Sequence, residues 1–426
     1  SIAFDKYMVM LLPFGYNIVR VDQVTEPPNP KREVVRVYSK GTYDNPNSES
    51  NTDNNLLVLY LEEYENKSIS IGISIIDITI GTSYCCEFHD NPKKNISALV
   101  EAYRVIYGSQ SNENVLYHKN IENIENIVSK LNLDDNNTTI IGDIDKKWYN
   151  INYQDTFIRN HFHCPGSIQP QDQFGLEMYH HCTLSMLLGV KFLEDHEIDI
   201  SKLLCKPKII GDTYSMTISQ GTIDVLDIVS KISKSNSSLL HILDDCKTPM
   251  GKRLLKSRLL QPIINKKELL RRYDMTDSIG EYNEVISSNI KYCYDIDRLH
   301  RKLCLGKLKL FEFANLDDTY KSINNIVSNI INSTDNSNKS NKLSDLLFND
   351  DKKNQLLLFN LFIETYRNTF NIEKFNSYSC VSDITENIFV EGKYQVLDQQ
   401  SIFIKNTLDE INDLRLELCM LSNDSE

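Results

Sequence analysis

The sequence lacks the features of several specialised classes of protein. It has no run of 18 apolar residues, so no part of it is expected to cross a membrane. Its ten cysteines include no Cys-x-x-Cys pair and follow no signal peptide, which favours reduced thiols in an intracellular compartment. Its only tryptophan is Trp148, and no ladder of basic and aromatic residues of the kind that binds single-stranded nucleic acid is present.

Motifs of nucleotide binding and nucleophilic catalysis are missing too. A P-loop requires the pattern GxxxxGK[ST], because its backbone N–H groups and lysine must enclose phosphates. No two of the 15 glycines are five positions apart, and the Gly-Lys pairs that begin at Gly251, Gly306 and Gly392 are followed by Arg, Leu and Tyr. No GxSxG elbow occurs. We therefore expect no catalytic residue and no bound cofactor in this chain.

What is present is an ordinary globular composition in a long, acidic chain. Its 426 residues are enough for several hydrophobic cores, and 41% of them are hydrophobic and 25% charged. The formal net charge is −13, so any binding of nucleic acid would need a local basic surface. Because the chain starts and ends within helical patterns, we expect it to be part of a longer protein.

The first half has the pattern of a mixed α/β fold. Segments rich in β-branched and aromatic residues predict strands, interrupted by two helices and a polar linker. The predicted strands are 16–21, 33–38, 56–61, 68–77, 81–88, 115–118 and 138–141, the helices are 96–107 and 121–131, and the linker is 46–55. Three strands followed by alternating helices and strands indicate a mixed sheet.

From about residue 173 the apolar period is that of helices. The first such helix carries Leu176 to Phe192, and a second runs from Thr248 as N-cap, with Pro249 at its first position, to Leu260. Apolar residues at 316, 320, 323, 327 and 330 predict an amphipathic helix, which a polar loop at 332–341 follows. Leu397, Ile404, Ile411 and Leu418 recur every seven residues and predict a long helix that can pair with another. The fold class is therefore multidomain α+β.

Four blocks of the sequence resemble blocks of MutS-type mismatch-repair proteins and follow the same order along the chain, as in a divergent viral or organellar member. The segment Thr248-Pro-Met-Gly-Lys-Arg-Leu-Leu255 with Pro262 resembles the core signature of that family. The signature residues are Thr248, Gly251, Arg253, Leu254, Leu255 and Pro262. The other blocks are Gly15-Tyr-Asn-Ile-Val-Arg-Val-Asp-Gln23 with Lys40-Gly-Thr42, Asp297-Arg-Leu-His-Arg301 and Phe389-Val-Glu-Gly392. The Phe-x-Glu wedge of the family is missing from the first segment, and Phe192-Leu-Glu194 and Phe362-Ile-Glu364 fit its spacing only in helical regions.

The resemblance implies an order of domains and a mechanical function. It implies a partial mismatch-binding domain (1–45), a linker (46–55), an RNase H-like connector (56–165), a helical core and lever (166–395) and the start of a long lever helix (396–426). Mismatched double-stranded DNA would be the partner, in a homodimer or a MutS-like heterodimer inside a compartment that contains DNA. ATP and Mg would bind only in the full-length protein, beyond residue 426.

Two basic segments are candidates for contact with phosphates. Lys31, Arg32, Arg36 and Lys40 flank or lie on a predicted strand of the segment that resembles the mismatch-binding domain, and we expect them to bind DNA. Lys247–Arg272 holds nine Lys or Arg residues and one acid, Glu268. The alternative for this second segment is the solvated face of a capped helix, which is the commoner use of such a charge run.

Two groups of potential metal ligands give alternative hypotheses. His161-Phe-His-Cys164 and His180-His-Cys182 contain good zinc ligands, but adjacent histidines on a helix point apart and the resemblance implies no metal, so no metal site is expected. Asp77, joined by Asp90, Asp143 and Asp145, is the alternative of an RNase H-like metal-dependent nuclease, although no second acid has a diagnostic spacing. A structural helical scaffold without DNA is the third alternative.

Overall fold

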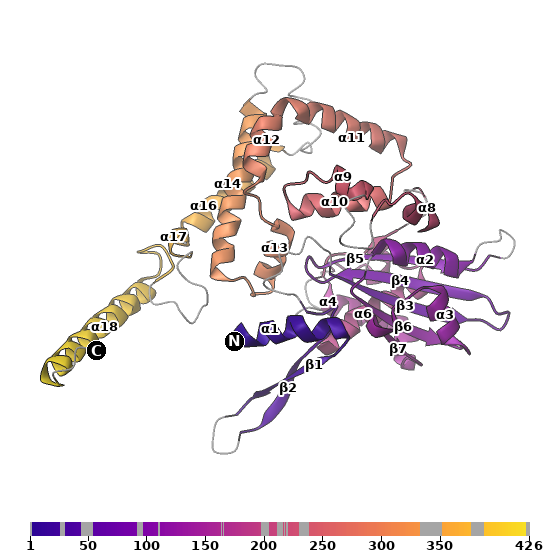
Figure 1. Ribbon diagram of the computed structural model, residues 1–426, viewed down its shortest axis with the longest axis horizontal. Coiled ribbons are helices and arrows are strands. Elements are labelled where there is room, and N and C mark those ends of the chain that lie inside the picture. Colours follow the sequence, from indigo (N-terminus) through magenta and orange to yellow (C-terminus); the bar gives the residue numbers. More distant parts are fainter. Residues whose placement is uncertain are drawn as a thin grey trace. The chain divides into compact units, whose positions relative to one another are not determined.

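The computed structural model describes most of the chain, which forms two units (Figure 1). The described residues are 2–25, 30–43, 54–91, 97–109, 111–162, 164, 166–196, 204–210, 216, 218, 220–229, 238–332, 352–375 and 387–422. The first unit comprises residues 1–269 and 300–305, and the second comprises 270–299 and 306–426. Most of the predicted linker, and the predicted polar loop after Asn332, lie outside the described residues.

The first unit contains all the strands of the described residues, together with helices on both sides of a sheet. Its strands are β1 (Ile18–Gln23), β2 (Arg32–Tyr38), β3 (Asn55–Glu63), β4 (Ile69–Asp77), β5 (Thr82–His89), β6 (Glu113–Lys119), β7 (Thr138–Ile141) and β8 (Lys208–Ile209). Its helices are α1 (Ile2–Leu11), η1 (Leu12–Phe14), α2 (Ala98–Ser109), α3 (Ile124–Lys130), η3 (Asp135–Asn137), η4 (Lys146–Tyr149), α4 (Ile151–His161), α5 (Pro170–Phe174), α6 (His180–His196), α8 (Gln220–Val225), α9 (Leu239–Leu243) and α10 (Pro249–Leu260).

Six of these strands form one sheet in the order β7-β6-β3-β4-β5-β8. Strand β4 is antiparallel to both β3 and β5. The other three pairs, β3 with β6, β6 with β7 and β5 with β8, are parallel. The prediction of a mixed sheet is therefore confirmed. The edge strand β8 was not predicted, because two residues are too few to show any alternation. Its presence corrects the expectation that the chain after residue 165 contains helices alone.

Both faces of the sheet are buried, which gives three layers (Figure 1). Successive side chains of a strand point to opposite faces, so the continuous apolar run of β3 fills both sides. Leu57 and Leu59 pack with the layer of α2 and α3, and Val58 and Tyr60 pack with the layer of α4 and α6. All four side chains are fully buried.

Helix α6 belongs to this core. Twelve of its residues, from His181 to Leu193, are buried, and its apolar side chains share a cluster with β3 and β4. The domain boundary predicted at residue 165 therefore separates elements that pack together in the structure. Leu176, predicted as part of this helix, is buried in the turn before it.

The second unit and the few residues before it in the sequence are helical. The helices after residue 265 are α11 (Lys266–Ile279), η5 (Gly280–Tyr282), α12 (Asn283–Ile290), α13 (Ile296–Cys304), α14 (Leu310–Asn332), α16 (Lys352–Arg367), α17 (Ile372–Phe375) and α18 (Gln395–Ser422). As the periodicity predicted, α14 buries Leu316, Tyr320 and Ile330. Its buried side chains contact α16 through Ile363. No described helix has the length and apolar content needed to cross a membrane.

Candidate nucleic-acid interface

The β1–β2 hairpin brings together basic side chains that lie far apart in the sequence. Residues directly opposite one another in an antiparallel pair project to the same face. Arg20 is opposite Arg36, Gln23 is opposite Arg32, and Ile18 is opposite Tyr38. Arg20 and Arg36 therefore share one face of the hairpin, which we call the arginine face. A register shift after Arg20 places Arg32, opposite Gln23, on the other face.

Neighbouring side chains hold both of these guanidinium groups in place. Arg36 Cζ lies 4.4 Å from the centre of the Tyr38 ring, within the range of a cation–π contact. Arg20 is paired with Asp22 at 2.6 Å, and the hydrogen bond to this carboxylate, more than any other contact, raises the pKa of Arg20. Both members of this pair are well exposed, so the pair adds little stability and leaves Arg20 able to exchange Asp22 for a phosphate.

The other two predicted DNA-binding residues lie outside the paired strands. Lys31 precedes β2 and is exposed, and its backbone N–H donates to Thr25 Oγ1. Lys40 follows β2, where its Nζ donates to Asn137 Oδ1 at 2.9 Å. In the same turn, the Gly41 N–H donates to the buried carboxylate of Glu113, so the turn anchors the hairpin to the sheet.

The arginine face makes the hairpin a basic region of an acidic protein. The described residues from Ile18 to Lys40 carry five Lys or Arg and only two acids, Asp22 and Glu33, against a net charge of −13 for the whole chain. Arg20 was missed by the sequence reasoning, since only the strand register places it beside Arg36. The available signal was a basic residue in each of two adjacent predicted strands.

The second basic segment has the local structure predicted for it. Thr248 caps α10, and its Oγ1 accepts the Gly251 N–H at 3.2 Å. A Cβ at Gly251 would lie 3.1 Å from that oxygen, which explains the need for a small residue. The predicted apolar face is only partly covered, because Leu254 is 51% exposed. Arg253, Leu255 and Pro262, the other predicted signature residues here, are half-buried.

Acids neutralise part of the charge on this segment. Lys247 pairs with Asp245 at 2.6 Å, and Lys252 lies 3.6 Å from Asp244. Arg253 and Lys256 also have interaction partners. These cations therefore already have partners, as Arg20 does on the hairpin.

Comparison with known proteins identifies the helical part. The model of the family MutS domain III matches residues 221–416. A mutS homolog of Acanthamoeba polyphaga mimivirus is 27% identical over 452 residues, a match that covers 97% of this chain and 38% of that protein. The chain is a divergent MutS-type protein.

Bacterial relatives in the same family agree with this assignment. The DNA mismatch repair protein MutS of Caldanaerobacter subterraneus subsp. tengcongensis is 28% identical over 330 residues, which is 74% of this chain and 35% of that protein. The MutS of Clostridioides difficile is 25% identical over 76% of this chain and 33% of its own length. The chain thus spans between a third and two fifths of these MutS relatives. The Thr248 cap lies inside the matched domain III.

The Phe-x-Glu pairs that fit the wedge spacing of MutS proteins lie in helices. Phe192 and Glu194 belong to α6, where Phe192 is 9% exposed in the core. Phe362 and Glu364 belong to α16. Neither pair is on the hairpin, as the sequence indicated.

The acids of the nuclease alternative have structural partners of their own. Asp77 is buried, and its Oδ1 accepts both the backbone N–H and the hydroxyl of Thr79. The Asp90 carboxylate accepts the Ile69 and Ala98 N–H groups, and Asp145 caps η4. In the described part of the chain, none of these acids, nor Asp143, joins a group of three potential metal ligands.

The described side chains of the two histidine–cysteine motifs also do not come together as a zinc site. His180 is exposed and His181 is buried, as expected for adjacent residues on a helix. His161 Nδ1 contacts the Phe157 carbonyl oxygen at 2.9 Å, and His163 lies outside the described residues. Cys182 is buried beside Cys85.

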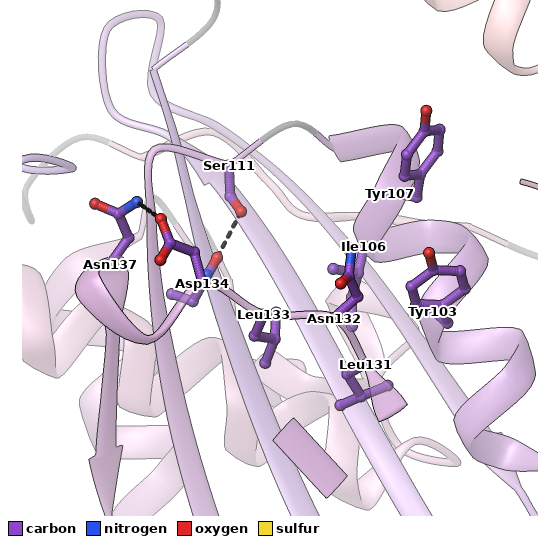
Figure 2. A pocket seen from close by; sticks show the side chains of 10 residues that line it. Tyr103, Ile106, Tyr107, Ser111, Leu131, Asn132, Leu133, Asp134 and Asn137 are labelled. Atoms are coloured by element: carbon purple, nitrogen blue, oxygen red, sulfur yellow. Dashed lines mark hydrogen bonds between the residues drawn. The ribbon is translucent and has the colours of Figure 1, made fainter. Parts of the chain in front are cut away.

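A pocket of about 240 Å³ lies between α2 and the segment that follows α3 (Figure 2). Tyr103 and Tyr107 stand on its α2 side, and Asp134 and Asn137 on the other. Two of its polar groups already have partners, because Asn137 Nδ2 donates to Asp134 and the Tyr107 hydroxyl donates to Asp224.

Proposed function

We propose that this chain holds mismatched double-stranded DNA and couples its bent state to an ATPase carried elsewhere in the whole protein, as part of mismatch repair. The observation that carries the proposal is the arginine face of the β1–β2 hairpin, a local basic surface in an acidic MutS-type chain. The named function of the relatives, DNA mismatch repair, supports the same interpretation.

The two arginines of this face suit contact with a DNA backbone. A guanidinium group presents several N–H donors in a fixed fork that matches phosphate oxygens, and strand residues on one face can follow the backbone. Such contacts position the protein but do not read sequence. The hairpin would therefore hold the duplex in register while another part of the protein senses the mismatch.

The remaining parts would transmit the state of the DNA. The strand order supports an RNase H-like connector, because three antiparallel strands (β3, β4 and β5) are followed at the β3 edge by the two parallel strands β6 and β7. Long helices such as α14 and α18 are stiff and suit the transmission of a displacement. In the whole protein we propose bound ATP and Mg, and a homodimer or a MutS-like heterodimer around the DNA.

A salt titration of duplex binding tests the arginine face. The double variant Arg20→Ala/Arg36→Ala of the whole protein should bind DNA more weakly. Its slope of log K against log salt should fall by about 0.9 for each phosphate that the protein no longer neutralises. Lys130→Ala/Lys146→Ala removes the same charge from exposed sites on α3 and η4 and is the matched control. Equal slopes for the two double variants would contradict the proposed contact.

A second measurement tests the larger proposal. The whole protein should bind a duplex with one mismatch more tightly than the matched duplex and should hydrolyse ATP. Equal affinity for the two duplexes would contradict mismatch recognition even if the hairpin contact holds. Cleavage of either duplex with a divalent metal, abolished by Asp77→Asn, would instead favour the nuclease alternative.

A further inference from the structure

Three potential metal ligands converge where the first turn of α6 meets strand β5. His89 Nε2 lies 2.8 Å and His181 Nδ1 lies 3.1 Å from the same oxygen, Glu87 Oε1. One donor atom from each of the three side chains lies within 4.8 Å of the others. We propose that Glu87, His89 and His181 form a binding site for a divalent transition-metal ion of the Zn²⁺ class.

A glycine on the neighbouring strand creates this arrangement. Gly72 on β4 is directly opposite Glu87 on β5, and a Cβ at Gly72 would lie only 2.0 Å from the His181 carbonyl oxygen. The helix backbone can rest on the sheet only because this side chain is absent. The N–H groups of His181 and Cys182 then both donate to Glu87 Oε2 at 2.9 Å. That oxygen is occupied, and Oε1 faces the two imidazoles.

The outer nitrogen of each imidazole also has an oxygen partner. His89 Nδ1 lies 2.7 Å from Ser70 Oγ. His181 Nε2 lies 3.1 Å from the Tyr64 hydroxyl and 3.3 Å from Glu62 Oε2. Metal-bound histidines typically donate their second N–H to such an oxygen, which fixes the ring orientation and directs the other nitrogen's lone pair at the ion. Each inner nitrogen lies at hydrogen-bond distance from Glu87 Oε1, so a bound ion would take the place of the proton in this contact.

The surroundings favour the charged form of the carboxylate, and the spacing is close to that of a metal site. Burial raises the pKa of Glu87, but hydrogen bonds from His181 and the Cys182 N–H and the nearby imidazoles outweigh this effect and leave the pKa below its usual value. Zinc–nitrogen and zinc–oxygen bonds of about 2.1 Å place tetrahedral ligands roughly 3.4 Å apart. The distances of 2.8 and 3.1 Å need only a small expansion to admit the ion.

The site is partly open to solvent, unlike a structural zinc site in which four protein ligands enclose the ion. The Glu87 side chain is 4% exposed, whereas the His89 side chain is 56% exposed, so one side of the cluster faces solvent. Three protein ligands and an open side leave the fourth position to water or to another ligand. Two nitrogens and one oxygen suit Zn²⁺, Co²⁺ or Ni²⁺ better than Mg²⁺ or Ca²⁺, which prefer oxygen alone.

This site changes the interpretation of the histidines in the sequence. We expected no metal, because adjacent histidines on a helix point apart and the resemblance implies no metal. In the structure its partners are two residues on β5, about 90 positions earlier in the sequence. The site is independent of the proposed DNA contact.

Zinc titration of the metal-free chain tests the proposal. Calorimetry with a competing chelator should give one Zn²⁺ per chain, and His89→Ala, which removes a ligand, should raise the Kd by more than the roughly 100-fold that is the upper end for an outer-shell partner. Ser70→Ala, which leaves the ligands intact, should raise the Kd about tenfold. His180→Ala removes an exposed imidazole next to His181 and should leave the Kd unchanged.

Cobalt and folding controls make the outcome decisive. Bound Co²⁺ should show visible absorption of a four-coordinate site without a sulfur charge-transfer band, since no thiolate is a ligand. Because His181 is buried, its substitution can unfold the chain, so the exposed His89 is the deciding variant, with circular dichroism to establish that it is folded. No binding by the parent chain, equal affinity in His89→Ala, or a sulfur band would each overturn the proposal.

Discussion

The central sheet and the helix α18 are both rich in apolar residues, but they differ in what covers them. Leu57 and Leu59 on β3 are fully buried, whereas Ile404 is 47% and Leu418 is 65% exposed on α18. The buried clusters of the described residues include no side chain of α18. Periodicity therefore identifies an element reliably, but it does not say whether the described chain supplies the partner for its apolar face.

The largest expected effect is at the contact between α6 and the sheet. Gly72→Val should lower the free energy of unfolding by about 3 kcal/mol or more, because its side chain would collide with the backbone at His181. Urea denaturation followed by circular dichroism measures this. Gly108→Ala on α2, where no atom lies within 4 Å of an added Cβ, should instead raise stability by about 0.5 kcal/mol. Similar values for both variants would show that the close approach is absent.

A truncation in the sheet core should have the next largest effect. Leu59→Ala should cost about 2–5 kcal/mol, because it removes a fully buried side chain between two layers and leaves a cavity. Thermal and urea unfolding both report this loss. Leu59→Met keeps most of the volume and should cost less than about 1.5 kcal/mol. A cost below about 1 kcal/mol for the alanine variant would contradict the three-layer packing.

The cap of α10 should contribute a smaller, local effect. Thr248→Ala removes the oxygen that accepts the Gly251 N–H and should cost about 1 kcal/mol. Thr248→Ser retains the oxygen and should lie within a few tenths of the parent value. Denaturation of the two variants side by side makes the comparison. If both lose the same stability, the methyl group rather than the cap is responsible.

The smallest effect is expected on α18. Ile411→Ala should change the stability of this chain by less than about 0.5 kcal/mol, because Ile411 is 55% exposed. The same denaturation experiment applies. A loss as large as that of Leu59→Ala would mean that this face of α18 is covered in solution, and the contrast between the two regions would disappear.

Much of the fold could be predicted because it depends on local pattern. The strand expected at 138–141 is β7 with the same bounds, and the expected Thr248 cap and Pro249 start of α10 are present. These features depend on alternation and on end signals that neighbouring residues carry. The hairpin strand that carries Arg32 and Arg36 was predicted for the same reason, whereas the position of Arg20 beside Arg36 was missed. The roles of Lys31, Arg32, Arg36 and Lys40 in DNA binding stay predictions.

The sequence by itself determined the mixed sheet, the helical second part and the absence of a P-loop motif, since each depends on residue types at short spacing. Only the tertiary structure decided that Arg20 lies opposite Arg36 and that Glu87 and His89 meet His181. Strand register and the seating of a helix on Gly72 depend on contacts between residues that are distant along the chain. Spacing within the sequence carries no record of such contacts, because they form only when the layers pack.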